Sequence, residues 1–109
     1  MSNDENNITQ NEIYNNGWAG IFLSYSEHTS ISNCNIMSNG QLFGDEGIYV
    51  TESNYSTIYK NNISQNGGGG IILDKNCFVS SIYENKINEN SGNGVQLRAS
   101  DGLIAYNLI

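Results

Sequence analysis

Apolar residues in this chain recur two positions apart and fall into short, separated clusters. Four of these clusters share one form, a glycine followed by an aliphatic residue, any residue and a second aliphatic residue: Gly20–Leu23, Gly47–Val50, Gly70–Leu73 and Gly94–Leu97. Residues two apart lie on one face of a β-strand, whereas an amphipathic helix needs a period of about 3.6 residues, which no stretch here shows. The pattern therefore predicts short β-strands and no helix.

The clusters belong to a longer repeat that runs through the chain. One isoleucine marks the same point in each repeat, at Ile8, Ile31, Ile58, Ile82 and Ile104, with separations of 23, 27, 24 and 22 residues. A second isoleucine follows five residues after each marker, and an asparagine stands eight residues after the first four markers, at Asn16, Asn39, Asn66 and Asn90. A regular period of this length indicates a solenoid.

Three short strands with three turns fit one such repeat, so we predict a parallel β-solenoid with one coil per repeat. A leucine-rich repeat has a similar period, but it would show a leucine ladder and a longer helical return segment. The longest interval is explained by the segment "GQLFGDE" between Asn39 and Gly47, which is four residues longer than the matching gaps. Solenoids accept such insertions in their turns.

Stacked coils place each residue over its equivalent in the previous coil, roughly 4.8 Å away. Inward aliphatic residues then form continuous columns, and two of these columns are Ile21, Ile48, Ile71, Val95 and Leu23, Val50, Leu73, Leu97. Each fully buried aliphatic side chain contributes roughly 1.5–3 kcal/mol to stability. Such a chain is ordered without a spherical core, because its stability is a sum over neighbouring coils.

The polar residues of the repeat also have predicted roles. The repeated asparagines are expected to adopt an unusual φ at sharp turns and to bond their amides to the next coil, forming an asparagine ladder. The glycine before each strand is expected to allow a positive φ or a tight corner. Three residues after each cluster stands a further small or polar residue, namely Ser26, Ser53, Asn76 and Ser100.

The composition agrees with this interpretation. The chain has 109 residues, of which 38% are hydrophobic, too few to fill a compact sphere, yet 14 are isoleucine, too many for a disordered polar tract. Proline is absent, which suits a chain that pairs nearly every backbone N–H. No apolar run approaches the roughly 18 residues of a membrane span. Cys34 and Cys77 have neither zinc nor redox-motif spacing, and we expect two buried free thiols.

The net charge of −7 is unevenly distributed along the chain. Residues 1–54 contain seven acidic residues and no Lys or Arg, whereas residues 55–109 contain four acidic residues and all four basic ones. Nucleic-acid binding depends on neutralising phosphates with basic side chains, so this distribution argues against a nucleic-acid partner. It also disfavours binding to anionic membrane surfaces.

The spacing N-x-I-x-x-N-G…G-I-x-L…S…I resembles the right-handed parallel β-helix repeat of pectate-lyase-like and NosD-type proteins, a group of carbohydrate-binding and sugar-hydrolysis domains. The resemblance extends from Ile8 to Ile109. It implies an all-β fold, a right-handed parallel β-helix of about four coils of 22–27 residues, forming one domain over residues 1–109. Enzymes of this group are usually longer and β-helix ends need caps, so we expect a segment of a longer protein, or ends that meet another chain.

Outward positions are where chemistry is expected. The clusters predict two outward columns, one of Phe22, Tyr49, Ile72 and Gln96 and one of Ser24, Thr51, Asp74 and Arg98. Aromatic faces stack on sugar C–H surfaces and carboxylates accept bonds from sugar hydroxyls, so this face predicts carbohydrate binding. The candidate ligand-binding residues are Trp18, Phe22, Tyr25, Asp45, Glu46, Tyr49, Glu52, Asp74 and Arg98. Alternatively, the same aromatic residues serve only as stabilising pairs between coils.

Catalysis and metal binding stay open alternatives. A glycoside hydrolase needs two carboxyl groups roughly 5–9.5 Å apart, and the candidate acids lie on adjacent predicted coils. No Asp-Asp pair or Gly-His-Gly stretch of the polygalacturonase kind is present, and no catalytic residue is assigned. A lyase or epimerase would depend on Arg98 beside Asp74, a pair that a surface salt bridge explains more simply.

No cofactor is assigned. Calcium among Asp45, Glu46 and Glu52 is an alternative without EF-hand spacing, and His28, the sole histidine, is expected in a solvated turn.

The sequence thus supports three functional hypotheses. The first is an extracytoplasmic module, secreted or at the cell surface or in the periplasm, that binds polysaccharide. The second is a structural spacer or surface or tail-fibre segment that associates end to end or with flanking coils of a longer chain. The third is a polysaccharide hydrolase, lyase or epimerase.

Overall fold

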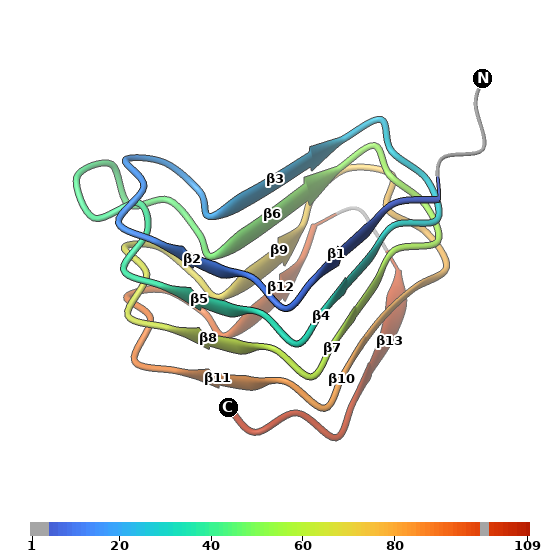
Figure 1. Cartoon of the computed structure of the whole chain (residues 1–109). Coiled ribbons are helices and arrows are strands. Elements are labelled where there is room, and N and C mark those ends of the chain that lie inside the picture. The colour runs from blue at the N-terminus through green and yellow to red at the C-terminus, as the bar shows by residue number, and fades with distance from the viewer. Residues whose placement is uncertain (1–4, 99–100) are drawn as a thin grey trace.

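A computed structural model describes residues 5–98 and 101–109, and these residues form three parallel β-sheets wound into a solenoid (Figure 1). Sheet A contains β1 (Asn7–Thr9), β4 (Ser30–Ser32), β7 (Thr57–Tyr59), β10 (Ser80–Tyr83) and β13 (Gly102–Ala105). Sheet B contains β2 (Glu12–Tyr14), β5 (Asn35–Met37), β8 (Asn62–Ser64) and β11 (Lys86–Asn88). Sheet C contains β3 (Ile21–Ser24), β6 (Ile48–Thr51), β9 (Ile71–Leu73) and β12 (Val95–Leu97).

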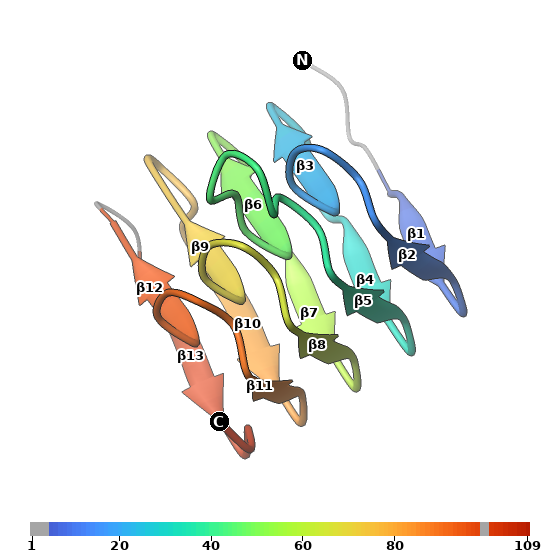
Figure 2. The same ribbon diagram turned by 90° about the vertical axis from the view of Figure 1, so that its left-hand side faces the viewer.

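Successive coils lie side by side in the same order as in the sequence (Figure 2). In sheet A each marker isoleucine pairs with the next one along the chain, from Ile8 to Ile104. In sheet B the second isoleucines pair in the same way, from Ile13 to Ile87. The predicted all-β parallel solenoid of about four coils is therefore confirmed, and no helix occurs in the described part of the chain.

The core is the set of inward columns between the three sheets. Isoleucines of the middle coils, such as Ile36, Ile48 and Ile63, are fully buried. Ile8 and Ile13 of the first coil pack against this core but are only partly buried. An inward side chain is covered by its equivalents in the coils on both sides, so only the middle coils are sealed completely.

Two asparagine ladders line the corners of the coils. In one ladder the Asn39 backbone N–H and side-chain Nδ2 both donate to Oδ1 of Asn66, at 3.0 and 3.1 Å, and Asn39 Nδ2 also donates to the Ile13 carbonyl at 3.0 Å. In the other ladder the Cys34 N–H donates to Oδ1 of Asn61 at 2.9 Å, so Cys34 occupies an asparagine position. Each amide thereby joins one coil to the next.

The prediction that the ladder asparagines themselves adopt positive φ was wrong. The positive φ lies one residue earlier, for example at Ser38 and Gln65, each with φ of 57°. The chain turns at this preceding residue, whose side chain points outward. The turn aims the next side chain, the ladder asparagine, into the coil.

The glycines before the sheet C strands have a steric role. Gly70 does not have a positive φ, but a Cβ there would lie 2.5 Å from Cγ2 of Ile87 and 2.6 Å from the Gly94 carbonyl oxygen. Positive φ among the described glycines occurs at Gly40 and Gly44, at the two ends of the inserted turn. Glycine is therefore needed before the strands for close packing, and the expectation of a positive φ at these positions is corrected.

One predicted column is shifted by a residue. Cys77, which is fully buried, takes the corner position that Ser26 and Ser53 hold in the preceding coils, and Asn76 is exposed with φ of 52°. The cause is an extra residue after β9, because Asn76 matches Glu52, which also has φ of 52°. Ser100, the predicted fourth member of the column, lies outside the described residues. Both cysteines are buried and free, as predicted.

The four inserted residues, Gln41 to Gly44, form an exposed turn between β5 and β6, visible as the projecting green loop in Figure 1. Their outward placement leaves the register of the sheets unchanged on both sides. In the described part of the chain there is no helix that is both long enough and apolar enough to span a membrane.

Candidate functional site

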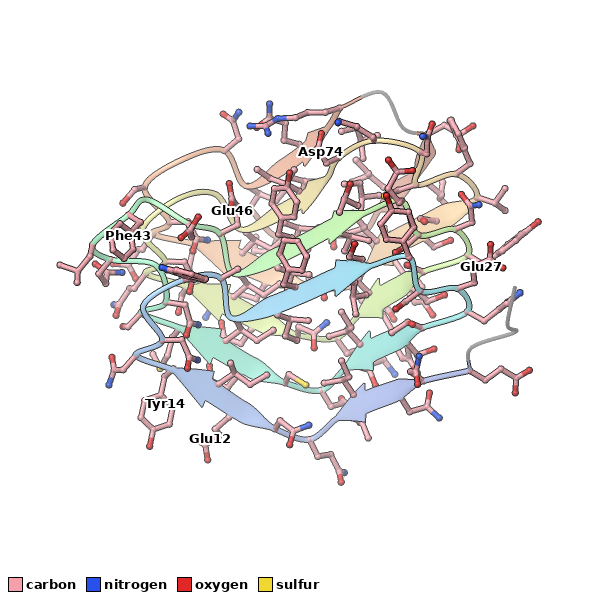
Figure 3. The ribbon with its side chains drawn as sticks, turned by 90° about the horizontal axis from the view of Figure 1, so that it is seen from above. Glu12, Tyr14, Glu27, Phe43, Glu46 and Asp74 are labelled. Atoms are coloured by element: carbon pink, nitrogen blue, oxygen red, sulfur yellow. The ribbon has the colours of Figure 1, made fainter. Side chains whose placement is uncertain are left out.

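One outward column of sheet C begins with aromatic residues in the first two coils. Parallel pairing places Phe22 beside Tyr49, Tyr49 beside Ile72, and Ile72 beside Gln96, as predicted. Figure 3 looks onto this face, with Glu46 and Asp74 over the sheet and Phe43 at its edge. Ile72 is only 3% exposed and is not part of the inner core, so neighbouring side chains cover it on the outer face.

The second column follows at the ends of the same strands. Ser24 pairs with Thr51, the Asp74 N–H donates to the Val50 carbonyl at 2.7 Å, and the Arg98 N–H donates to the Leu73 carbonyl at 2.8 Å. Thr51, Asp74 and Arg98 therefore lie on successive coils, as the sequence predicted.

Two aromatic pairs border this face. The rings of Phe22 and Tyr49 are parallel, with 3° between their planes and 5.3 Å between their centroids. Trp18 meets Phe43 edge to face, with centroids 6.5 Å apart and planes at 71°. The sequence analysis did not select Phe43, although the insertion that carries it was recognised. Trp18 is 71% exposed, so most of its indole surface is accessible to a ligand.

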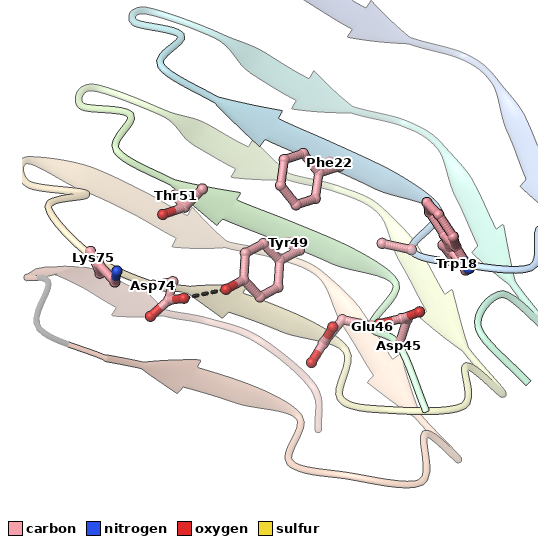
Figure 4. A pocket seen from close by; sticks show the side chains of 9 residues that line it. Trp18, Phe22, Asp45, Glu46, Tyr49, Thr51, Asp74 and Lys75 are labelled. Atoms are coloured by element: carbon pink, nitrogen blue, oxygen red, sulfur yellow. Dashed lines mark hydrogen bonds between the residues drawn. The ribbon is translucent and has the colours of Figure 1, made fainter. Parts of the chain in front are cut away.

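Trp18, Phe22 and Tyr49 belong to the lining of an open depression of about 450 Å³ (Figure 4). Its lining consists of Trp18, Ala19, Phe22, Asp45, Glu46, Tyr49, Thr51, Asp74 and Lys75. Six of the nine residues predicted from the sequence are thus brought together, and Ala19, Thr51 and Lys75 are added.

The other three predicted residues lie outside the lining of the depression. Tyr25 is exposed in the turn after β3, where its φ is 54°. Glu52 lies at the corresponding turn of the next coil and accepts a hydrogen bond from Nδ2 of Asn76 at 3.0 Å. Arg98 is exposed on the fourth coil, where its charge still acts on Glu46 and Tyr49.

Tyr49 and Asp74 form a polar pair at the floor of the depression. The Tyr49 hydroxyl donates a hydrogen bond to the carboxylate of Asp74, as the dashed line in Figure 4 shows. This bond, together with partial burial and the negative charge of Asp74, raises the pKa of Tyr49 to about 12. The phenol of Tyr49 therefore stays neutral over the physiological pH range.

Glu46 is the second perturbed acid in the depression. Burial raises the pKa of its carboxyl group, and the negative charges of Asp45 and Asp74 raise it further. A hydrogen bond to its own backbone and the positive charge of Arg98 act in the opposite direction. Two carboxyl groups in one depression thus differ in environment, since Asp74 accepts a hydrogen bond and Glu46 is disfavoured in its charged form.

The geometry does not support the calcium alternative. Asp45 and Glu46 line the depression, but Glu52 does not. Within residues 5–98 and 101–109, no group of three or more His, Cys, Asp and Glu side chains is placed to hold a metal ion. His28 lies in a turn, as expected, and its ring stacks on Tyr55 with centroids 4.6 Å apart.

Comparison with known proteins agrees with the architecture. Residues 1–109, the full length, match a family model described as a right handed beta helix region. No curated protein and no solved structure matched the chain. Three parallel sheets, one coil per repeat and a family match along the whole chain lead to one conclusion: the chain belongs to the right-handed β-helix family.

Proposed function

We propose that this chain is a polysaccharide-binding β-helix module and that the depression over sheet C is its binding site. One observation carries the proposal. Exposed aromatic surface and carboxylates of three successive coils line a single open depression. Sugar rings need both, because their C–H faces are apolar and their hydroxyl groups form hydrogen bonds.

Each part of the lining has a role in this proposal. Trp18 and the parallel rings of Phe22 and Tyr49 provide the apolar surface. The carboxylates of Asp45, Glu46 and Asp74 accept bonds from hydroxyl groups. Because Phe22 and Tyr49 follow one another from coil to coil, the sugar chain would run along the solenoid axis.

Cross-coil stacking for stability is the competing explanation of the aromatic residues. It applies to Phe22 and Tyr49, which stack on each other. Trp18 and Phe43 also pair between neighbouring coils, but both are mostly exposed and Phe43 lies in the inserted turn, so Trp18 discriminates between the two explanations. Its substitution should leave the coils intact and remove binding surface.

A glycan array followed by titration with the best ligand tests the proposal. Trp18→Ala should weaken binding about fivefold, which corresponds to roughly 1 kcal/mol for one lost stacking contact. Tyr14→Ala is the matched control, since Tyr14 is an exposed aromatic residue on sheet B, outside the depression. Absence of any bound polysaccharide, or equal effects of the two substitutions, would refute the proposal.

Cleavage of the bound polysaccharide is a second candidate function, favoured by the two carboxyl environments. Glycoside hydrolysis needs one protonated and one ionised carboxyl group, and the pKa of Glu46 is raised by burial while the Asp74 carboxylate in the same depression accepts a hydrogen bond from Tyr49. New reducing ends or unsaturated uronates, formed by the wild type and lost in Asp74→Asn, would support it. If the polysaccharide is not cleaved, only the binding function stands. We also propose an extracytoplasmic location, where polysaccharides are accessible; recovery of the native protein from the cytosolic fraction would contradict it.

A further inference from the structure

We infer that the polysaccharide bound over sheet C carries positively charged amino groups, as deacetylated amino sugars do, and that the depression prefers it to neutral or uronic-acid chains. This inference rests on the proposed function and names the ligand class of the same site. It depends on three features of the depression: its charge, the position of its carboxylates, and the aromatic surface beside them.

The charge of the lining is negative. Asp45, Glu46 and Asp74 contribute three carboxyl groups, and Lys75, which is exposed, is the one basic side chain in the lining. Residues 1–54, which form most of the first two coils, contain seven acidic residues and no Lys or Arg. A depression with a negative electrostatic potential attracts cations and repels uronates.

The carboxylates are concentrated beside the tryptophan. The Gly20 N–H donates to the Glu46 carbonyl at 3.2 Å, so the residues before β6 follow directly after those before β3 in the stack. Asp45 and Glu46 thereby occupy, one coil on, the positions of Trp18 and Ala19. A ligand over Trp18 would have these two carboxylates next to it.

The aromatic surface suits a cation as well as a sugar ring. Trp18 and Phe43 stand nearly perpendicular and form a corner at the edge of the depression. Indole gives the strongest cation–π interaction among the side chains, and ammonium groups bind best where an aromatic face and a carboxylate are both close. A neutral sugar would use the same rings but would gain nothing from the carboxylates beyond hydroxyl bonds.

The burial of Glu46 beside other acidic side chains favours binding of a cation. Its charged form is disfavoured by burial and by Asp45 and Asp74, while Arg98 opposes these effects and Tyr49 and Lys75 share the depression. An ammonium group placed there would stabilise the ionised carboxylate. Binding of the amino sugar should therefore lower the pKa of the Glu46 carboxyl group, whereas binding of its uncharged analogue should not.

The experiment compares three oligosaccharides of equal length on the wild-type chain by calorimetry. These are a glucosamine oligomer, its N-acetylated counterpart and a galacturonic acid oligomer. We expect the glucosamine oligomer to bind at least tenfold more tightly than the other two, and added salt to reduce this preference. The wild-type comparison does not depend on the folding of any variant.

Two double variants then locate the preference. Asp45→Asn with Glu46→Gln should weaken binding of the glucosamine oligomer much more than binding of the N-acetylated oligomer and thereby abolish the preference, because the amide oxygens still accept hydroxyl bonds but carry no charge. Glu12→Gln with Glu27→Gln removes the same formal charge at residues far from Glu46 (Figure 3) and should preserve the preference. Equal losses from both pairs would overturn the inference, because the attraction would then be a property of net charge.

The outcomes separate the inference from the proposed function. If the N-acetylated or galacturonic acid oligomer binds as tightly as the glucosamine oligomer, the inference fails and carbohydrate binding stands. If none of the three oligomers binds but the glycan array shows another polysaccharide ligand, the inference fails and the proposed function stands; if the array shows no ligand either, both fail. If polylysine binds as tightly as the glucosamine oligomer and Trp18→Ala changes neither, the binding is non-specific electrostatic attraction and the inference is also overturned.

Discussion

At the scale of single residues, the side of the coil that a residue faces decides its chemistry more than its type does. Asn66 and Asn62 illustrate this, since Asn66 is buried with its amide bonded to two coils and Asn62 is exposed on a strand of the same coil. Tyr49 and Asp74 show the same on the outer face. Tyr49 lies within β6 and Asp74 directly follows β9, the next strand of sheet C, and this placement brings the two side chains together.

The Tyr49–Asp74 pair gives a prediction about titration. Because the bond raises the pKa of Tyr49 to about 12, above the ordinary value of roughly 10, the pair stabilises the folded chain below pH ~10 and loses that contribution as the pH rises towards 12. In Asp74→Asn the acceptor is uncharged, so the late-ionising tyrosine should shift towards the ordinary value. Tyrosinate absorbance as a function of pH measures this.

Tyr49→Phe should remove the late step from the same titration. Asp101→Asn, at an exposed acid outside the depression, should leave the step in place. A wild-type chain without any late-ionising tyrosine would show that the Tyr49–Asp74 bond does not form.

At the scale of elements, the unit of stability is the contact between equivalent positions of neighbouring coils. Strands of three or four residues are too short to be stable alone, and each is fixed by parallel pairing with its neighbours. The corners are fixed by the asparagine ladders. Glycine before each sheet C strand lets an isoleucine side chain approach the backbone closely.

The ladder gives a prediction about stability. Asn66 Nδ2 donates to the Ile36 carbonyl at 3.2 Å and to Oδ1 of Asn90 at 2.8 Å, and its Oδ1 accepts two bonds from Asn39. Asn66→Ala would leave the buried Asn39 N–H without its partner and would remove one bond each from the Ile36 carbonyl, Asn39 Nδ2 and Asn90 Oδ1. It should cost about 3 kcal/mol or more, at about 1–3 kcal/mol for the unsatisfied group and about 0.5–1.5 kcal/mol for each other lost bond. Unfolding in urea measures the free-energy difference.

Asn62→Ala is the matched control for this experiment. Asn62 lies in the same coil and makes one exposed bond, to Oδ1 of Asn35 at 3.3 Å. Its removal should change the free energy of unfolding by less than about 0.5 kcal/mol. Similar losses for the two variants would show that the ladder does not bear on stability.

At the scale of the whole molecule, the solenoid is a stack in which each coil contacts only its neighbours. Such an architecture tolerates additions that project from a turn, because the register of the sheets is set on both sides of them. The insertion between β5 and β6 is an addition of this kind. It leaves the pairing of β6 with β3 and β9 in place while it brings Phe43 to Trp18.

Deletion of residues 41–44 tests this separation of scaffold from site. The shortened chain should keep its β-sheet circular dichroism and a cooperative unfolding transition, because all four residues are exposed. It should bind polysaccharide more weakly, because the aromatic corner beside Trp18 is lost. Deletion of residues 62–65, which removes β8, is the control and should abolish the transition. Loss of folding on deletion of residues 41–44 would contradict the prediction.

The fold was predictable from the sequence because stacking makes the same demands in every coil. An inward isoleucine, a ladder amide and a close glycine each recur at the repeat period, so the pattern reports the register directly. Two details were not predictable. The extra residue after β9 shifts Cys77 into the position expected for Asn76, and the positive φ precedes each ladder asparagine. Both depend on the path of a turn, which local residue type does not specify.

The candidate site was predictable only in part, for a related reason. The sequence by itself determined the columns, because strand alternation fixes which residues face outward, and it thereby identified Phe22, Tyr49 and Asp74. The tertiary structure decided which of these residues share one depression: it included Lys75, excluded Glu52, and placed Phe43 against Trp18. Inward side chains are held by neighbours that repeat, whereas outward side chains near turns are placed by loop geometry that occurs once in the chain.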